Sequence, residues 1–597
     1  MVEQKNIICQ TLLILTLCTV SLGWLIQFSF HQTWLCIFGQ IPWHKGFYLS
    51  CLMASLPLLY SLSLLLKGDC FPVIDLDYQD GLISIILVFF GVLFWYFFSM
   101  DAAHYPVHTY GDEAFHSNRV EIMATDLRAW FNYFFHLKPA PSFRAEYMMY
   151  PSLAYVPVTL WTFILGHPES IIYQRMFLVI NYLAIILTTY LLARLIIKSK
   201  PMSTLIALIP MTSTLLIAYT MSFYIEMQYV SVLMLSFWLL TLGIEKHSEN
   251  IVITAVFVAS LAPIIRESAI TGTLGIVFTS ALWRYFTVST DQKFITRFVI
   301  LTRYFIAGLL PFFMYYVAKS NYTDWDKTRT SLSFIIHQDY LSLLKYAFVY
   351  LGPTAIFSFI YLILQPKIAK PYWYLFLAAI IGIISSIAIQ AIFLPGYMPW
   401  TRNYLFAYAQ FMVLIILCFN SLWLSNNKTK NTAIVLVLIT VIVNITLTIR
   451  CLYNNALFHE SEVVFNLEPI SRYITSHPDK FKNQTLYLYW PDHFPTFPEK
   501  LLPSFVVLKT LTSPKPEPLF LSFNAINSTL PDKVNYLLFY YLKNESLPQA
   551  FNSIPNVQQP KADELNSYTL LVNSVDPWSQ GRNGVILLER KNNYRPQ

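Results

Sequence analysis

The sequence has little charge. Only 12% of its 597 residues are Asp, Glu, Lys or Arg, whereas a soluble domain carries about twice that fraction, and 56% are hydrophobic. So apolar a chain requires lipid rather than water as its solvent, which argues against a soluble globular protein. The net charge of +7 does not indicate a nucleic-acid partner, because Lys and Arg stand in short clusters between apolar runs, as topology-setting residues do. We therefore expect an α-helical polytopic membrane protein that contacts membrane lipids and no nucleic acid.

Cysteine is also scarce. The chain has seven cysteines, none of them beyond Cys451, and no pair has the spacing of metal ligands. These absences argue against a disulfide framework and against a zinc module. We find no internal repeat of the kind that marks many transporters. The apolar run 7–30 lacks a small-residue cleavage pattern and contains Trp24 and Gln27, so we interpret it as a retained first span rather than a signal peptide.

Long apolar runs are plentiful. A bilayer core of about 30 Å requires about 20 apolar residues per helix. Thirteen runs meet this requirement, at 7–29, 47–66, 81–100, 171–197, 202–220, 227–244, 250–265, 268–288, 298–318, 342–364, 372–394, 403–424 and 432–450. We expect two N-terminal helices within 1–80, a bundle over 81–450 with an outer catalytic loop at 101–170, and a soluble domain over 451–597.

The short basic connectors set the topology. If the N-terminus is cytoplasmic and the helices alternate, every one of these connectors falls on the cytoplasmic side. Their basic residues are Lys67, Arg194, Lys198, Lys200, Lys246, Arg284, Lys293, Arg297, Lys367, Lys370, Lys428 and Lys430. An odd number of spans then puts the C-terminus and the two longest loops on the other side.

The two long outer regions differ in pattern. In the first, the run 151–166 is too short for a span and predicts a helix lying at the membrane interface. The C-terminal region is more polar, and strand-like runs alternate with Pro- and Asn-rich turns, which predicts a small extracytoplasmic α/β domain. The strand-like runs are 486–490, 505–508, 536–541, 569–572 and 585–588.

Titratable residues are densest in the first outer loop. The adjacent carboxylates Asp112 and Glu113 follow Gly111 and precede an amphipathic stretch at 114–135. Taken alone, the loop has the composition of an ordinary solvated loop. Its titratable residues are Asp101, His104, His108, Asp112, Glu113, His116, Arg119, Glu121, Asp126, Arg128, His136, Lys138, Arg144 and Glu146.

Three further charged positions fall on the same outer side. Glu226 begins the sixth span, Arg266 and Glu267 interrupt the hairpin between the seventh and eighth spans, and Arg402 opens the twelfth span. Each alone is typical of a helix end. Ionisable groups near membrane depth are costly, however, and their joint placement favours an acid/base site that binds an anionic ligand.

A metal site is the open alternative for part of this loop. His104, His108, Asp112 and His116 recur every four residues, which on a helix would give one ligand-rich face. Pro106 and Gly111 interrupt such a helix. We therefore expect no metal and no other cofactor, and keep a divalent metal as the competing hypothesis.

Several segments together resemble the C-type glycosyltransferase superfamily, in the branch of protein O-mannosyltransferases and bacterial lipid A aminoarabinose transferases. Segment 111–116, Gly-Asp-Glu-Ala-Phe-His, resembles the acidic pair of that branch. Segments 150–155 and 165–169, followed by Arg175, are similar to its Pro-Pro-Leu helix, its Phe-Gly turn and its span-heading arginine. Glu226, Arg266–Glu267 and 402–404 resemble an acidic span start, a Lys-Glu pair and an Arg-Tyr pair.

The chain departs from the family pattern in two places. The family's Lys-Pro-Pro is Tyr150-Pro151-Ser152 here, so the phosphate-contacting lysine is missing, and Arg144 or Lys138 is the candidate substitute. Two additional spans precede the first span of the resemblance, which covers about 85–450.

The resemblance implies a reaction. Such enzymes move a monosaccharide from a polyprenyl-phosphate lipid to a hydroxyl of a lipid, glycan or protein acceptor, with inversion. By resemblance Asp112 is the base, and Glu113 and Glu226 assist it. Arg266 and Arg402 bind the departing phosphate. Four further residues are expected to bind substrate: Tyr404, Arg175, Arg144 and His116. A bacterial inner membrane fits better than the endoplasmic reticulum.

Two other classes of protein compete with this interpretation. A transporter or flippase would place its charges at mid-membrane and show paired repeats, whereas the charges here gather at one face. A polymerase or ligase of surface polysaccharide would carry a dominant outer loop late in the bundle. A scaffold that has lost catalysis is the remaining alternative.

Overall fold

A computed structural model describes the helical bundle and the centre of the C-terminal region. The residues described are 77–99, 113, 116–117, 120–121, 154–167, 170–220, 223–287, 301–309, 351–365, 372–393, 404–425, 427–453, 468–481, 484–489, 522–525, 535–541, 567–575 and 584–591. The predicted spans 7–29 and 47–66 lie outside these residues, so the number thirteen stays a prediction.

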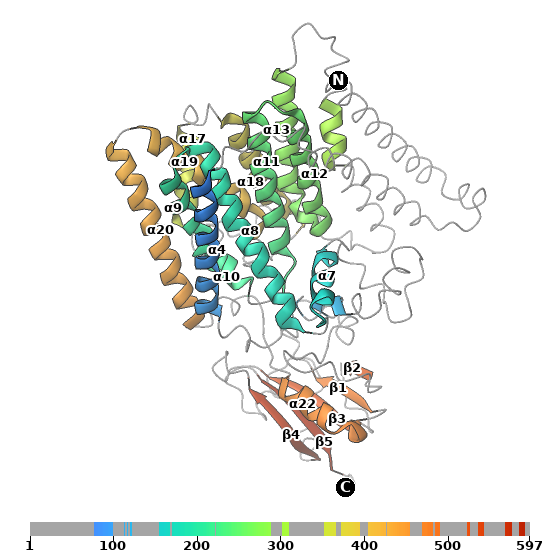
Figure 1. Ribbon diagram of the computed structural model, residues 1–597. Helices are drawn as coiled ribbons and strands as arrows, with labels where there is room; N and C mark the ends of the chain where they lie inside the picture. Colours follow the sequence, from blue (N-terminus) through green and yellow to red (C-terminus); the bar gives the residue numbers. More distant parts are fainter. Residues whose placement is uncertain are drawn as a thin grey trace, which may run out of the picture.

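Long apolar helices dominate the described chain (Figure 1). The helices of the bundle, long and short, are α4 (Tyr78–Ser99), α7 (Val156–Ile164), α8 (Ile171–Ile197), α9 (Lys200–Met211), α10 (Thr214–Ala218), α11 (Glu226–Glu245), α12 (Glu249–Ile265), η4 (Glu267–Ala269), α13 (Ile270–Thr287), α17 (Pro353–Leu364), α18 (Trp373–Phe393), α19 (Leu405–Ser425) and α20 (Asn427–Tyr453), with a further helical segment at 301–309. Within the described ranges, α4, α8, α11, α19 and α20 are long and apolar enough to cross a membrane by length and composition. The chain is a multi-pass membrane protein.

The helices alternate in direction, which gives the bundle two distinct ends. α8 begins at the end where Arg175 binds Glu113, and its last turns lie beside Asp80. We call these the Glu113 end and the Asp80 end. The basic connector residues of the described chain gather at the Asp80 end: Arg194, Lys198, Lys200, Lys246, Arg284, Lys428 and Lys430. This is the segregation that the sequence predicts, and the membrane side that each end faces stays a prediction.

The predicted span 202–220 is divided. α9 ends at Met211 just after an internal Pro210, and Ser213 caps the separate helix α10. Proline has no N–H and its ring disfavours a continuous helix, so the ladder breaks here. Polar side chains of α20 meet the break: Asn444 Nδ2 lies 3.4 Å from the carbonyl oxygen of Ile209, and Thr448 Oγ1 lies 2.8 Å from Thr214 Oγ1. Such partners allow a broken helix at membrane depth.

Small residues allow α13 and α18 to pack closely. A Cβ placed on Gly275 would lie 2.2 Å from the carbonyl oxygen of Ala378, and one on Gly272 would lie 2.6 Å from the side-chain amide of Gln410. Helix association in lipid depends on such close van der Waals packing rather than on a hydrophobic driving force. These two glycines therefore bring α13 against α18 and α19.

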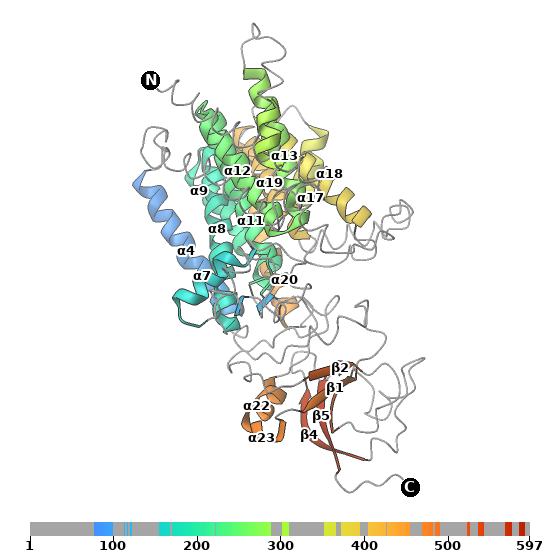
Figure 2. The ribbon, with the colours of Figure 1, turned by 90° about the vertical axis from the view of Figure 1, so that its right-hand side faces the viewer.

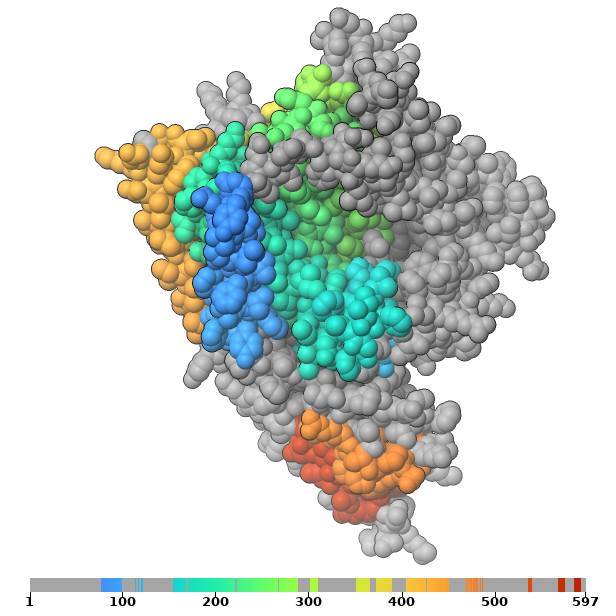
Figure 3. Space-filling model, in the orientation of Figure 1, coloured from blue at the N-terminus to red at the C-terminus, as the bar shows by residue number. Residues whose placement is uncertain are grey.

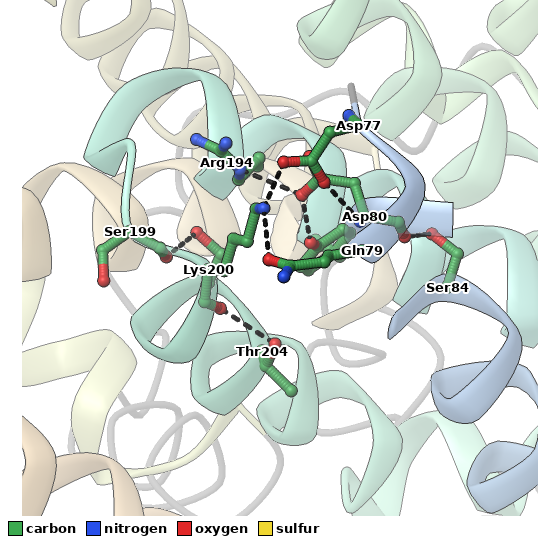
Figure 4. Close-up of polar contacts among 10 residues, drawn as sticks. Asp77, Gln79, Asp80, Ser84, Arg194, Ser199, Lys200 and Thr204 are labelled. Carbon is green, nitrogen blue, oxygen red and sulfur yellow. Dashed lines mark hydrogen bonds and ion pairs between the residues drawn. The ribbon is translucent and has the colours of Figure 1, made fainter. Parts of the chain in front are cut away.

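A cluster of ion pairs fixes the start of α4 to α8 and α9 (Figure 4). The backbone N–H groups of Asp77 and Asp80 each donate to the other's carboxylate at 3.1 Å, a reciprocal cap. Asp80 Oδ1 also accepts from the Tyr190 hydroxyl at 2.6 Å and from Arg194 Nε at 3.0 Å. Lys200 binds Asp77 and thereby lowers the pKa of that carboxyl below its usual value.

The outer faces of α4 and α20 are apolar. α4 lies on the outside of the bundle along its whole length (Figure 3), and its side chains Ile85, Phe89 and Phe97 are largely exposed. Against α8 it packs closely, since a Cβ on Gly91 would lie 2.8 Å from Leu183 Cδ2. An exposed face made of large apolar side chains requires lipid around it.

The C-terminal region contains a five-stranded mixed sheet in the order β2-β1-β3-β5-β4. The strands are β1 (Thr485–Tyr489), β2 (Ser522–Ala525), β3 (Tyr536–Tyr541), β4 (Tyr568–Val575) and β5 (Gly584–Arg590). β1 pairs in parallel with β2 and β3, whereas β5 runs antiparallel to β3 and β4. Four of the five strand-like runs therefore match strands; 505–508 lies outside the described residues, and β2 was not predicted.

Two short helices, α22 (Glu468–Ser476) and α23 (Pro478–Phe481), lie on one face of this sheet (Figure 2). Lys480 Nζ bonds Glu589 Oε2 at 2.6 Å, and the Tyr536 hydroxyl donates to Glu589 Oε1 at 3.2 Å. These bonds fix α23 to β3 and β5. Figures 1 and 2 place the sheet beyond the Glu113 end of the bundle.

Candidate active site

The described residues of the first outer loop form one buried helical face. Glu113, His116, Ser117 and Val120 are helical and fully buried. Their spacing of three and four residues places them on the same side of a helix. The amphipathic pattern predicted for this stretch is therefore present where the structure describes it, and it turns a carboxylate and an imidazole toward the bundle.

Arg175 binds the Glu113 carboxylate through both oxygens. Arg175 Nε lies 2.8 Å from Oε1 and Nη2 lies 2.9 Å from Oε2, and both side chains are almost completely buried. The backbone N–H of Phe223 donates a further bond to Oε1. A guanidinium fork and a backbone amide satisfy a buried carboxylate well, because charge-assisted bonds are strong at low dielectric. The sequence predicted both charged residues for the site, and the structure brings them together.

His116 lies one helical turn beyond Glu113 and contacts the start of α7. Its Nδ1 lies 2.5 Å from the Tyr155 hydroxyl, and its ring meets the edges of Phe223 and Tyr224 at centroid distances of 6.3 Å. The imidazole is fully buried. This position suits a residue that holds the loop helix in place, and the substrate contact that the resemblance implies for His116 stays a prediction.

Two amides join the same segments through the backbone. Gln228 Nε2 donates to the carbonyl oxygen of Ala154 at 2.8 Å, and Gln174 Nε2 donates to that of Ser117 at 3.4 Å. The loop helix, the start of α7, the start of α8 and the start of α11 are thus tied to one another. Polar groups from these four helical segments are buried and hydrogen-bonded to one another. This part of the loop is therefore packed into the bundle rather than exposed as a surface loop.

A second ion pair lies at the start of α11. Glu226 is the first residue of that helix and is fully buried, and Arg266 follows the last residue of α12. Arg266 Nε lies 3.6 Å from Glu226 Oε1, and the arginine side chain is 16% exposed. Phe223, whose backbone N–H donates to Glu113, lies three residues before α11, so both ion pairs meet at this helix end.

The remaining predicted site residues divide into two groups. Tyr404 is described and buried beside the start of α19, and α19 packs on α11 at this end through Phe406 and Tyr229, whose ring centroids lie 5.7 Å apart. Three predicted residues lie outside the described part of the chain: Asp112, Arg144 and Arg402. Their roles stay predictions.

Sequence reasoning did not single out Tyr155, Phe223, Gln174 or Gln228. Tyr155 ends the segment 150–155 that the resemblance named, Gln174 directly precedes Arg175, and Gln228 stands two residues beyond Glu226. The Phe223 contact uses a backbone N–H, which no side-chain pattern reveals.

The described residues neither support nor test the hypothesis of a divalent metal. Among the described residues, no group of three or more His, Cys, Asp or Glu side chains could hold a metal ion. His104, His108 and Asp112 lie outside those residues, and His116 is engaged with Tyr155.

No protein-family model matches the sequence, and no curated protein matches it. Several solved structures are similar in fold. ArnT from Cupriavidus metallidurans, bound to undecaprenyl phosphate, is 12% identical with a TM-score of 0.44 and covers 86% of this chain and 99% of its own. The apo oligosaccharyltransferase of Archaeoglobus fulgidus is 11% identical with a TM-score of 0.41 and covers 69% of this chain.

The arabinosyltransferase EmbB from Mycobacterium smegmatis is 13% identical with a TM-score of 0.38 and covers 63% of this chain. The chain spans 62% of the oligosaccharyltransferase and 34% of EmbB. These proteins are C-type glycosyltransferases, the superfamily that the sequence motifs resemble. Because the identities lie below 25% and the TM-scores below 0.5, no substrate, partner or residue role is transferred from them to this chain.

Proposed function

We propose that this chain is a membrane glycosyltransferase that moves a monosaccharide from a polyprenyl-phosphate donor to a hydroxyl of an extracytoplasmic acceptor. One observation carries the proposal: two carboxylate–guanidinium pairs, Glu113–Arg175 and Glu226–Arg266, meet at one end of the bundle. They come from segments far apart in sequence and are largely removed from water. Fixed charges at such a place are suited to a reaction in which negative charge moves from an attacking oxygen to a leaving phosphate.

The residues divide into an anchor and a base. Glu113 accepts from three donors, so its charge is committed to Arg175 and Phe223. We therefore assign Glu113 to positioning and the proton transfer to its neighbour Asp112. In the reaction the acceptor oxygen bonds to the anomeric carbon as the bond from that carbon to the phosphate oxygen breaks. The electron pair leaves with the phosphate, the acceptor proton passes to Asp112, and the anomeric centre inverts.

Arg266 and Arg402 complete the proposal as the phosphate-binding residues. Arg266 is only partly buried, and its Nε stands at 3.6 Å from Glu226, longer than a normal hydrogen bond. A guanidinium that is partly exposed at this end of the bundle is accessible to a phosphate oxygen. Arg402 is included from its sequence position beside Tyr404, which lies at the same end.

A donor lipid labelled in its sugar distinguishes a glycosyltransferase from a lipid transporter, because only the enzyme moves the label to a new molecule. The purified chain, in detergent with a membrane extract as acceptor source, is incubated with polyprenyl-phosphate sugars labelled in the sugar. We expect label in a new covalent product and unlabelled polyprenyl phosphate in equal amount. If reconstituted vesicles instead carry intact labelled lipid from one leaflet to the other with no product formed, the chain is a flippase and the proposal fails.

The orientation in the membrane is part of the proposal. We place the Asp80 end in the cytoplasm, the Glu113 end and the C-terminal sheet on the non-cytoplasmic side, and the protein in a bacterial inner membrane. Cysteines introduced singly at Lys430 and Lys561, in a cysteine-free chain, test this with an impermeant thiol reagent. We expect opposite accessibilities in oriented vesicles, and labelling of both from one side contradicts the orientation.

A further inference from the structure

Helix α7 carries apolar side chains on both of its faces. The side that contains Val158 is buried, whereas Leu160, Phe163 and Ile164 on the other side are 49%, 49% and 77% exposed. None of the nine residues of the helix is charged. A surface helix that faces water carries charged or polar side chains on its outer side, so the exposed face of α7 is suited to lipid.

The turn after α7 holds the helix against the start of α8. Gly166 adopts a left-handed conformation with a φ of +74°, and the two backbone bonds that close the turn form a Schellman motif. Trp161 Nε1 donates to the Tyr173 carbonyl oxygen at 2.9 Å, and the Tyr173 ring is stacked on that of His167 at a centroid distance of 4.9 Å. Because Tyr173 is the third residue of α8, α7 is fixed at the level of the first turn of that helix.

The Glu113–Arg175 ion pair lies at nearly the same level. Arg175 follows Tyr173 by two residues, which is about 3 Å along a helix axis. At the other end of α7, Tyr155 directly precedes the helix, and its hydroxyl lies 2.5 Å from His116 Nδ1. The depth at which α7 lies in the membrane therefore sets the depth of the ion pair.

The apolar surface of α7 continues onto the outward faces of its neighbours. Met176 and Ile180 of α8 are 39% and 43% exposed, and Phe97 in the last turn of α4 is 69% exposed. Figure 3 shows α4 and α7 on the same face of the molecule. The outer face of α4 requires lipid, and the exposed face of α7 is continuous with it. A helix of nine residues is about 14 Å long and cannot cross a bilayer core of about 30 Å, so α7 lies at the boundary of that core.

We propose that α7 inserts Leu160, Phe163 and Ile164 into the lipid leaflet at the Glu113 end and so holds the nearby ion pair at the depth of the lipid headgroups. The sequence predicts a helix at the interface, and the inserted face and the depth of the ion pair follow from the exposures and the contacts with α8. An apolar helix face at the boundary of headgroups and acyl chains is stabilised by the area that it removes from water. At this depth a lipid-borne phosphate meets the ion pair without leaving its leaflet. The placement itself does not depend on the proposed transfer reaction.

The test measures the depth of single labels in lipid nanodiscs. Ile164→Cys, Met176→Cys and Ile442→Cys are introduced one at a time into the cysteine-free full chain and labelled with an NBD fluorophore. The phosphatidylcholine of the nanodiscs carries a nitroxide on the headgroup, on carbon 5 or on carbon 12 of an acyl chain. We expect the headgroup and carbon-5 nitroxides to quench the first two labels most. Ile442, near the middle of α20 and 62% exposed, is the control for the membrane centre and should be quenched most by carbon 12.

A label in water completes the comparison. Ser476→Cys, at an exposed position of α22, should be quenched by iodide and by none of the lipids. If the label at Ile164→Cys is quenched by iodide alone, or by neither iodide nor any lipid, its face is not inserted in the leaflet. If carbon 12 quenches Ile164→Cys or Met176→Cys most, the ion pair lies deeper than the headgroups and the proposal is wrong.

A polar substitution on the same face identifies the side chains that insert. Phe163→Asn, added to the labelled Ile164→Cys chain, should shift its quenching from the lipid nitroxides toward iodide, because the inserted face loses an aromatic ring. Ile387→Asn on α18 is the matched control, since Ile387 is 51% exposed on another helix, and it should leave the label unchanged. An unchanged label in the Phe163→Asn chain, or an equal shift in both chains, contradicts insertion through this face.

Discussion

Arg175 and Glu113 form a buried two-bond ion pair between the first turns of α8 and the loop that carries the acidic pair. The two bonds measure 2.8 and 2.9 Å, and the carboxylate is completely removed from solvent. The pair joins two segments more than 60 residues apart in sequence. The placement of Glu113 against the bundle therefore depends on an arginine of another helix.

Neutralising only Arg175 should destabilise the protein more than neutralising Arg175 and Glu113 together. Arg175→Gln leaves a buried carboxylate uncompensated, and we expect the free energy of unfolding to fall by about 3–5 kcal/mol. Glu113→Gln combined with Arg175→Gln leaves no buried charge, so the double variant should be more stable than Arg175→Gln alone. Thermal unfolding in detergent of the parent, both single variants and the double variant measures the coupling. Additive losses would show that the two side chains do not act as a pair.

The hydroxyl of Tyr155 should matter through His116. Tyr155→Phe keeps the ring but removes the group that lies 2.5 Å from His116 Nδ1, so a buried imidazole nitrogen loses this partner. We expect a loss of about 1–3 kcal/mol in the free energy of unfolding. Tyr361→Phe on α17 is the control, because that ring is stacked on Phe357 through its face. If Tyr155→Phe and Tyr361→Phe melt at the same temperature, the His116–Tyr155 contact does not stabilise the fold.

The sequence indicated the helices well because apolar length is a strong signal. α4, α8, α11 and α19 each begin and end within a few residues of the predicted runs. The division of 202–220 was missed, since Pro210 was not weighed against the length of the run. β2 was missed as well, because a four-residue strand with Ser and Asn in it has no distinctive alternation.

The sequence pointed to several charged residues that the structure pairs, but it did not contain the pairings. Glu113, Arg175, Glu226 and Arg266 stand out as charges beside apolar runs. Which carboxylate faces which arginine depends on how the helix ends meet, and the sequence spacing does not contain that information. The assignment of His116 to substrate was made by resemblance, and its burial against Tyr155 follows from tertiary packing.

Gly275 should not tolerate a side chain. An added Cβ would lie 2.2 Å from the Ala378 carbonyl oxygen, a backbone atom of α18 that cannot rotate away. Gly275→Ala is therefore expected to lower both the yield of folded protein and its melting temperature. Gly81→Ala in α4 has open space around the new methyl group and should be neutral or stabilising by up to about 1 kcal/mol. If both variants melt as the parent does, α13 and α18 are not packed as closely as described.

The two aspartates at the start of α4 should respond differently to neutralisation. Asp80 is 1% exposed and accepts from Tyr190, which is buried, and from Arg194, which is partly buried, so Asp80→Asn disturbs two donors and should destabilise by about 1–3 kcal/mol. The Asp77 side chain is 56% exposed, and its ion pair with Lys200 is screened by water. Asp77→Asn should therefore have little effect, and the difference should persist at high salt. If Asp77→Asn lowers the free energy of unfolding more than Asp80→Asn does, then Asp77 rather than Asp80 holds the start of α4 in place.

The central claim is that Asp112 takes the proton in a sugar transfer, and one comparison tests it most directly. Turnover of a labelled polyprenyl-phosphate sugar is measured for the parent, Asp112→Asn and Asp126→Asn, which neutralises another carboxylate of the same loop. We predict a loss of about 10²- to 10⁴-fold for Asp112→Asn, with donor binding and melting temperature unchanged, and near-parental turnover for Asp126→Asn. Full turnover in a well-folded Asp112→Asn protein would contradict the assignment.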